Sequence, residues 1–264
     1  MADRLIVQGK ALWQRRAPRS YAHLGTAWQF WRIGENVRAR LAAVAYALGA
    51  RGVIGARHSV HVFDAGQGEF PDIRAILMDR MYERVPGFGP HRGSIVVDVG
   101  ANVGTFSLYH AGYGARVYAF EPQATPFRRF QRAIALSGLS AVIGAAPLAV
   151  ADYDGRGSLD TSNPSTTMAT LRETALGGAI VVARLDSVLD GLSHVDLLKI
   201  DTEGAEDVVL AGARSLLSRT DRVILEYHDA DKYTVCQAVL RAAGFTIVAQ
   251  DVPDGPLALG LIFA

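Results

Sequence analysis

The sequence has very little cysteine and no long apolar stretch, and each shortage excludes a class of protein. Its 264 residues contain a single cysteine, Cys236, so neither an internal disulfide nor a metal site built from several cysteines can form. The first ten residues lack the apolar core of a signal peptide. The longest apolar run, which starts at Leu41, is too short to span a bilayer. We therefore expect a cytoplasmic protein.

The net charge is close to balance at +1, but two parts of the chain differ in sign. Residues 1–60 hold 10 Lys/Arg against 2 Asp/Glu, and the remainder holds 17 against 24. A basic segment can meet an anionic membrane, a phosphorylated substrate or an acidic partner. It can also be a helical face that packs on the acidic remainder or on a second copy of the chain. We favour the second alternative, which leaves room for a homo-oligomer formed through this extension.

The first part of the chain is predicted to be an extension of the main domain. Residues 22–50 show apolar positions at helical spacing, interrupted by glycines, which predicts two helices. A strand at 57–64 and a helix at 71–82 are expected next. We divide the chain into a helical, basic extension at 1–55 and a main domain at 56–264.

The stretch S-I-V-V-D-V-G-A-N-V-G-T-F-S, residues 94–107, organises the rest of the sequence. Its β-branched run is typical of a strand buried on both faces. Gly100 and Gly104 then allow a sharp turn and the approach of a ligand to the backbone. Apolar residues resume at helical spacing after Gly104. A strand, a glycine turn and a helix are therefore predicted, with free N–H groups pointing at a ligand.

The turn lacks two of the glycines that a dinucleotide-binding fingerprint needs. Such a fingerprint starting at Gly100 requires glycine at positions 102 and 105, where the chain has Asn102 and Thr105. Asp98 at the strand end is badly placed for a pyrophosphate and suits a cationic amino group. S-adenosylmethionine carries an amino group and a sulfonium and no phosphate. The methyl donor is therefore favoured over the alternative, a nicotinamide cofactor of an NAD(P)-dependent oxidoreductase.

A second buried strand, R-V-Y-A-F-E-P, ends in Glu121, 17 positions after Gly104. A carboxylate at the end of the strand after the glycine turn can accept both ribose hydroxyls. A purely structural strand has no need of an acid there. Glu121 is therefore predicted to hold the ribose of the donor.

Three motifs in order resemble the FkbM family of S-adenosylmethionine-dependent methyltransferases. They are D-V-G-A-N-V-G at 98–104, F-E-P at 120–122 and L-L-K-I-D-T-E-G-A-E at 197–206, and the likeness covers roughly residues 56–230. The resemblance implies an O-methyltransferase acting on a hydroxyl of a secondary metabolite or a sugar. It implies that the segment after the third strand lies beside the adenine. The expected donor-binding residues are Asp98, Gly100, Ala101, Asn102, Gly104, Thr105, Glu121 and Ala149.

The remaining pattern completes the fold class of this resemblance. A helix at 124–136, a third strand at 141–143, a fourth at 195–200 and a fifth in R-V-I-L-E-Y-H-D are expected, followed by a terminal hairpin. Alternating strands and helices with a final antiparallel pair predict an α/β class I methyltransferase fold, Rossmann-like, with a seven-stranded, doubly wound sheet. The section 152–179 is polar, and it is where we expect substrate specificity to be set. Within it, S-N-P-S-T-T from Ser162 is expected to be a loop or a pair of ragged strands that acts as a lid.

Acidic side chains are expected to converge where the parallel strands end. Strands one, two, four and five deliver Asp98, Glu121, Asp201 and Glu226, with His228, to this edge. A divalent metal held by Asp201 and Glu226 is an alternative to the positive groups of the donor. We do not favour it, because no single element shows a His-and-acid spacing. The sequence therefore predicts no metal site.

A hydroxyl acceptor must lose its proton, so a base is needed at this edge. Three residues are candidates for this catalytic role: Asp201, Glu203 and His228. His228 ordinarily titrates near neutral pH, and burial can tune the two acids. Glu206 is assigned a structural role, and Lys199 either bonds a donor or substrate oxygen or extends to solvent.

One alternative of another class is a non-catalytic partner protein that keeps the donor site. Nucleic-acid methylation is not expected, because the acidic core lacks a basic groove and an N-P-P-aromatic motif.

Overall fold

The structure is a computed structural model of the chain, and it describes most of the residues after 51. The described ranges are 52–56, 59–63, 75–77, 79–160, 170–173, 179–253, 255 and 259–264. The expected helices within 22–50 and the expected lid, 162–167, lie outside them. Within these ranges, no helix is long and apolar enough to cross a membrane.

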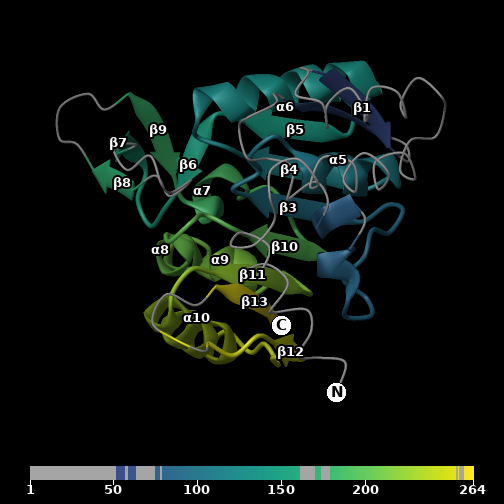
Figure 1. Ribbon diagram of the computed structural model, residues 1–264. Helices are drawn as coiled ribbons and strands as arrows, with labels where there is room; N and C mark the ends of the chain where they lie inside the picture. Colours follow the sequence, from purple (N-terminus) through teal and green to yellow (C-terminus); the bar gives the residue numbers. More distant parts are fainter. Residues whose placement is uncertain are drawn as a thin grey trace, which may run out of the picture.

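A seven-stranded sheet forms the centre of the molecule (Figure 1). The strands lie in the order β12-β13-β11-β10-β3-β4-β5, and β13 runs antiparallel to both of its neighbours. This arrangement confirms the predicted fold class and the terminal hairpin. The third strand begins at Ile143, where the sequence predicted it to end. The strands are β3 Ile95–Val99, β4 Arg116–Phe120, β5 Ile143–Ala146, β10 Leu197–Ile200, β11 Val223–Tyr227, β12 Ala249–Gln250 and β13 Gly260–Phe263.

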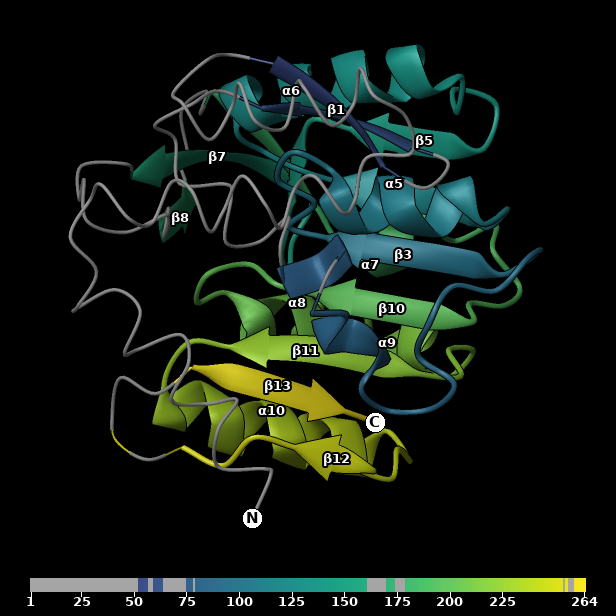
Figure 2. The same cartoon turned by 45° about the vertical axis from the view of Figure 1, so that its right-hand side comes forward.

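Helices cover both faces of this sheet because its central strands are apolar on both sides. In β10, Leu197 packs in one buried cluster with side chains of α5 (Thr105–Gly112) and α6 (Ala124–Ser137). Leu198 and Ile200 pack in the other cluster, with α8 (Glu206–Ala211), α9 (Arg214–Leu217) and α10 (Ala230–Ala242). Figure 2 shows α5 on the near side of the sheet and α10 behind it. The two apolar cores hold the strand ends in fixed positions.

The helix ends follow the glycines of the sequence. Gly138 after α6 and Gly244 after α10 both have left-handed φ angles, 67° and 95°, as expected of residues that end a helix. The helical pattern after Glu206 divides into α8 and α9 at Gly212. A Cβ on Gly212 would lie 1.9 Å from the Ala151 carbonyl oxygen, so only glycine permits this close approach.

A second sheet of four strands stands beside the main one. It projects from the main sheet at the upper left of Figure 1. The order is β6-β9-β7-β8; β6 and β9 pair in parallel, and β7 pairs antiparallel with both β8 and β9. The stretch S-N-P-S-T-T from Ser162, for which a loop or ragged strands were predicted, lies outside the described residues, and the expected lid stays a prediction. The strands are β6 Leu148–Val150, β7 Gly155–Asp160, β8 Thr170–Glu173 and β9 Ile180–Ala183.

The segment before the main sheet differs from prediction at two points. The strand predicted at 57–64 is present as β2 Ser59–Phe63, but it forms a hairpin with a strand that was not predicted, β1 Gly52–Ala56. Strand β2 lies against α5 and α6. The expected helix at 71–82 is helical at 75–77 among its described residues. It cannot continue through Arg80, whose φ of 47° is left-handed. A short 3-10 turn, η1 Met81–Glu83, follows.

The sheet order brings the functional motifs to one edge. β3 has β10 and β4 as its parallel neighbours, and Asp98 lies between Lys199 and Ala119 in register. The residues that follow β3, β4, β10 and β11 therefore meet at the carboxyl ends of four adjacent strands. This is where ligands of open α/β sheets bind.

Candidate active site

The glycine turn after β3 is shaped by close packing of the protein against itself. Gly100 has a φ of 78°, and a Cβ on it would lie 1.7 Å from the carbonyl oxygen of Asp201. Gly104 has a φ of 81°, and its Cβ would lie 1.9 Å from the Phe130 ring. The sequence predicted that these glycines admit a ligand to the backbone. The structure shows that each is also required where the turn meets a neighbouring element.

The turn is tied directly to the acid at the end of β4. The carboxylate of Glu121 accepts the backbone N–H of Asn102 at 2.9 Å and that of Gln123 at 2.7 Å. Burial raises the pKa of Glu121, while these two N–H groups favour the ionised form and oppose that rise. A carboxylate has about four lone-pair positions, so two remain for a ligand. The predicted neighbours Asn102 and Glu121 are thus brought together.

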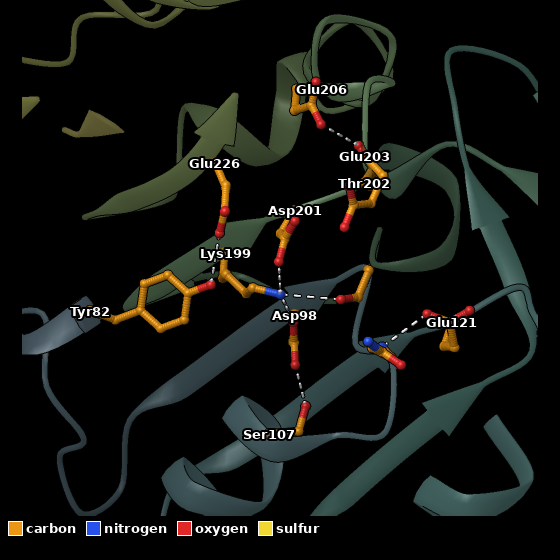
Figure 3. A network of polar contacts seen from close by, with 12 residues as sticks. Tyr82, Asp98, Ser107, Glu121, Lys199, Asp201, Thr202, Glu203, Glu206 and Glu226 are labelled. Carbon is orange, nitrogen blue, oxygen red and sulfur yellow. Dashed lines mark hydrogen bonds and ion pairs between the residues drawn. The ribbon is translucent and has the colours of Figure 1, made fainter. Parts of the chain in front are cut away.

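A buried lysine joins the ends of β3 and β10 (Figure 3). The Lys199 ammonium lies 3.2 Å from Asp98 Oδ1 and 3.3 Å from Asp201 Oδ2, and donates to the Gly100 carbonyl oxygen at 3.1 Å. Burial alone would lower the pKa of Lys199, but the two carboxylates outweigh it and raise the pKa. Lys199 is 3% exposed, so it does not extend to solvent as one alternative expected. Its cationic form is a fixed part of this edge.

Asp98 is fully buried and already has partners within the protein. Besides Lys199, its carboxylate accepts the Ser107 hydroxyl of α5 at 2.6 Å. A ligand amino group at this place would have to share the carboxylate with Lys199. Direct contact between Asp98 and the donor therefore stays a prediction, and the roles of Ser107 and Lys199 were not foreseen in the sequence.

His228, at the end of β11, lies among three carboxylates of the turn after β10. Its Nε2 is 3.1 Å from Glu203 Oε2 and 3.8 Å from Asp201 Oδ1, and its Nδ1 is 2.9 Å from Glu206 Oε1. Burial alone would lower the pKa of His228. The hydrogen bonds and charges of Glu203 and Glu206 outweigh burial and raise the pKa to about 11.

This raised pKa bears on the choice of base. The sequence interpretation counted on a histidine that titrates near neutral pH, whereas these surroundings keep His228 as an imidazolium, which has no lone pair to take a proton. Asp201 and Glu203 keep side-chain exposures of 23% and 37% and can meet an acceptor. The structure thus brings together the three predicted catalytic residues, and the two carboxylates are better suited to accept the proton.

Glu206 has more partners than the structural role predicted for it would need. It is fully buried at the start of α8, and Oε1 also accepts the N–H of Gly204 at 2.7 Å. Glu203 and Gly204 both have left-handed φ angles, 57° and 114°, which fold the turn back over this carboxylate. Glu206 therefore anchors both the turn and the His228 ring.

The other expected site residues lie in different surroundings. Thr105, the first residue of α5, has a buried hydroxyl with no hydrogen-bond partner among the described residues. Ala149 is buried in β6, which belongs to the second sheet. Ala101 donates its N–H to the Phe120 carbonyl oxygen and accepts from Gly104. Glu226, considered earlier as a metal ligand with Asp201, instead accepts the Tyr82 hydroxyl at 3.3 Å.

The fold defines a class of protein. Numbering the strands of the main sheet in chain order gives 3-2-1-4-5-7-6, with strand 7 antiparallel, which is the class I methyltransferase arrangement. Two solved structures share the fold. The METTL16 MTase domain has a TM-score of 0.52 at 11% identity, covering 95% of this chain and 92% of that chain. Putative transferase PH0793 from Pyrococcus horikoshii has a TM-score of 0.51 at 14% identity, covering 81% and 71%.

Within this class, the chain belongs to the FkbM methyltransferase family. Residues 98–247 match the family described as "Methyltransferase FkbM domain". The chain is 31% identical over 226 residues to the 31-O-demethyl-FK506 methyltransferase FkbM of Streptomyces tacrolimicus, covering 72% of this chain and 86% of that protein. It is 29% identical to Methyltransferase 1 of Beauveria bassiana, covering 69% and 82%. The predicted family is confirmed, and the chain is a methyltransferase.

Proposed function

We propose that this protein is an O-methyltransferase that uses S-adenosylmethionine to methylate a hydroxyl of a secondary metabolite or a sugar. The observation that carries the proposal is the pairing, at one sheet edge, of the buried Glu121 carboxylate with the partly exposed carboxylates of Asp201 and Glu203. The first suits a donor ribose and the other two suit a hydroxyl acceptor. The Streptomyces relative is named for an O-methylation, which supports the same chemistry.

The residues around the glycine turn fit the donor. Glu121 retains lone pairs for the two ribose hydroxyls after binding Asn102 and Gln123. The buried Thr105 hydroxyl offers an unused donor and acceptor beside the same turn. When bound, S-adenosylmethionine supplies a methyl group made electrophilic by the sulfonium. The chain itself has to hold that group, align the acceptor and exclude water, which can be equivalent to an effective molarity of up to ~10⁵ M or more.

The acceptor edge has to move one proton. The acceptor oxygen forms a bond to the methyl carbon as the carbon–sulfur bond breaks, and that bond's electron pair stays on sulfur. The hydroxyl proton passes to a carboxylate oxygen of Asp201 or Glu203. The ammonium of Lys199 and the ring of His228 lie within 4 Å of the Asp201 carboxylate and hold it at the acceptor edge. Such a base typically contributes about 10²–10⁴-fold to the rate.

Calorimetric titration tests the donor site. We expect S-adenosylhomocysteine to bind and NAD⁺ not to bind. Glu121→Gln should weaken S-adenosylhomocysteine by about 10–100-fold, because hydrogen bonds to a charged carboxylate contribute about 1.5–3 kcal/mol. Asp221→Asn, at the opposite edge of the sheet, serves as the control and should bind like the wild type. Binding of NAD⁺ instead would replace the methyltransferase proposal with the oxidoreductase alternative.

An acceptor screen tests the chemistry. The first acceptors to try are 31-O-demethyl-FK506 and simple sugars with free hydroxyl groups, with the methylated product followed by mass spectrometry. Asp201→Asn and Glu203→Gln should lower kcat while S-adenosylhomocysteine affinity stays within about twofold of the wild type. Unchanged methyl transfer in cell extracts that contain Asp201→Ala, Glu203→Ala or His228→Ala would instead favour a binding protein without catalysis of its own.

A further inference from the structure

Three side chains at the acceptor edge place metal-ligating atoms around one point. The Nε2 of His228 and one oxygen each of Asp201 and Glu203 lie within 4.8 Å of one another. Nε2 is 3.1 Å from the Glu203 oxygen and 3.8 Å from the Asp201 oxygen. Two ligand atoms that share an ion at about 2.1 Å lie about 3.0–3.4 Å apart when their bonds meet at about 90–110°. The spacing therefore suits a shared cation with small movements of exposed side chains.

A fourth residue, Glu206, orients the His228 ring for coordination. Glu206 Oε1 lies 2.9 Å from His228 Nδ1 and accepts the hydrogen of that nitrogen. A cation that displaces the proton from Nε2 of the imidazolium then meets a ring nitrogen directed at Asp201 and Glu203. Metal-bound histidines usually donate their second N–H to a carboxylate in this way. Glu206 is fully buried, and its Oε2 has no hydrogen-bond partner among the described residues. Because one oxygen of this buried carboxylate has no hydrogen-bond partner, a further positive charge near Glu206 would stabilise it.

The trio is open on one side. The His228 and Glu206 side chains are 8% and 0% exposed, whereas those of Asp201 and Glu203 are 23% and 37% exposed. Figure 3 shows Asp201 and Glu203 coming from the turn after β10, and Glu206 at the start of the helix that follows, α8. Three protein ligands with an open side are the arrangement of catalytic metal sites, where the remaining position takes water or substrate.

We propose that Asp201, Glu203 and His228 bind one divalent cation, which takes the hydroxyl oxygen of the acceptor as a further ligand. The inference rests on the proposed function. The sequence disfavoured a metal because no single element shows a His-and-acid spacing, but the fold builds the set from two elements, the turn after β10 and the end of β11. Coordination lowers the pKa of a bound hydroxyl. With Asp201 and Glu203 acting as ligands, the proton leaves to water instead of to their carboxylates as the oxygen–methyl bond forms.

A second His-and-acid trio provides a matched control. At the opposite ends of the same strands, His194 Nε2 lies 3.4 Å from Asp196 and 3.5 Å from Asp221. Both carboxylates contact the same ring nitrogen, and the three side chains are 45%, 35% and 50% exposed. This trio has similar spacing but lacks burial. It tests whether any loose cluster of these residue types binds the ion.

Mn²⁺ is the probe, because its ligands are commonly carboxylate and imidazole and its EPR signal falls on binding. Titration of the purified chain with S-adenosylhomocysteine present should show one Mn²⁺ per chain. Glu203→Gln should abolish measurable binding, and Glu206→Gln, which keeps the shape of Glu206, should weaken it by about 10–100-fold. His194→Ala should bind like the wild type. Thermal melting monitored by circular dichroism should confirm that each variant is folded.

Three results would overturn the metal site: no Mn²⁺ binding by the wild type up to millimolar concentrations, unchanged binding in folded Glu203→Gln, or an equal loss in His194→Ala. A parallel calorimetric titration with S-adenosylhomocysteine separates this failure from failure of the proposed function. Donor binding without Mn²⁺ overturns the metal alone. Mn²⁺ binding without donor binding supports the metal and counts against the donor assignment.

Discussion

Strands β10 and β11 carry the same residue types at both ends, in different surroundings. At the carboxyl ends, His228 lies 3.1 and 3.8 Å from two acids; at the amino ends, His194 lies 3.4 and 3.5 Å from two others. The distances are similar, yet the side-chain exposures of the histidines are 8% and 45%. Water surrounds the His194 ring, whereas it is largely excluded from the His228 ring and reaches the two acids beside it. Burial, more than spacing, therefore distinguishes a candidate site from a surface ion pair.

A third histidine, His110, shows the effect of burial on a histidine pKa where no carboxylate opposes it. His110 on α5 is 2% exposed, stacks on Phe106 with ring centroids 4.2 Å apart, and has an Nδ1 without a hydrogen-bond partner among the described residues. Burial first, and the nearby His91 second, lower the pKa of His110 to about 3. His228 is buried as well, yet its pKa is raised. The comparison shows that nearby carboxylates can outweigh the cost of burying an imidazolium.

The largest effect is expected from Lys199→Met, which removes the buried cation at the carboxyl ends. Asp98 would then stay buried with Ser107 as its remaining named partner. Breaking a buried ion pair on one side costs about 3–5 kcal/mol, so the free energy of unfolding in urea should fall by that amount. Lys232→Met, which removes a half-exposed partner of Asp207, is the control and should cost about 1 kcal/mol or less.

A double variant sharpens this test. Adding Asp98→Asn to Lys199→Met removes the stranded charge and should recover a substantial part of the lost stability. If the Lys199→Met protein were as stable as the Lys232→Met control, the claim that the buried Lys199 ammonium stabilises the fold through Asp98 would be wrong.

The next effect concerns His110 and pH. Its folded-state pKa lies below the unfolded value of 6.5, so the unfolded chain binds the proton first, and stability is lost as pH falls from 6.5 towards 3. At pH 5 the loss amounts to about 2 kcal/mol relative to pH 7.5. His110→Met should shrink the difference in unfolding free energy between these two pH values by that amount. An unchanged difference would mean that His110 is protonated in the folded protein.

The smallest effect is expected at the exposed trio. His194→Ala should change the free energy of unfolding by less than about 0.5 kcal/mol, because exposed ion pairs contribute little. Methyl transfer should be unaffected. A loss above about 1 kcal/mol in urea unfolding would show that the amino-end cluster is more than a surface ion pair.

The sequence predicted the parts of the site that depend on a single element and its neighbour. The run ending at Asp98, the turn with Gly100 and Gly104, and the acid of Glu121 all follow from local patterns. The seven-stranded sheet follows from their alternation with helices. These features are predictable because strand periodicity and glycine conformations are local properties.

The partnerships across elements were not predictable in the same way. Lys199 appeared either solvent-directed or ligand-directed, because nothing in L-L-K-I-D reveals that Asp98 and Gly100 face it across the sheet. The ring partner of His228 was likewise hidden, since Glu206 lies 22 positions away on another element. The raised pKa of His228 depends on Glu206 as well as on Glu203. A sequence pattern shows which groups reach the edge, and the fold decides which pairs form.

The parallel pairing of β6 with β9 bears on how the length of the segment between these two strands can vary. Residues 148–150 and 181–183 flank the segment 151–180, and their ladder brings the two ends of that segment together. Because doubling the length of a loop costs only about 0.6 kcal/mol, the intervening chain can lengthen or shorten with little effect on stability. The chain between β6 and β9 is thus the part that protein engineering can exchange, while β6, β9 and the strands of the main sheet stay intact.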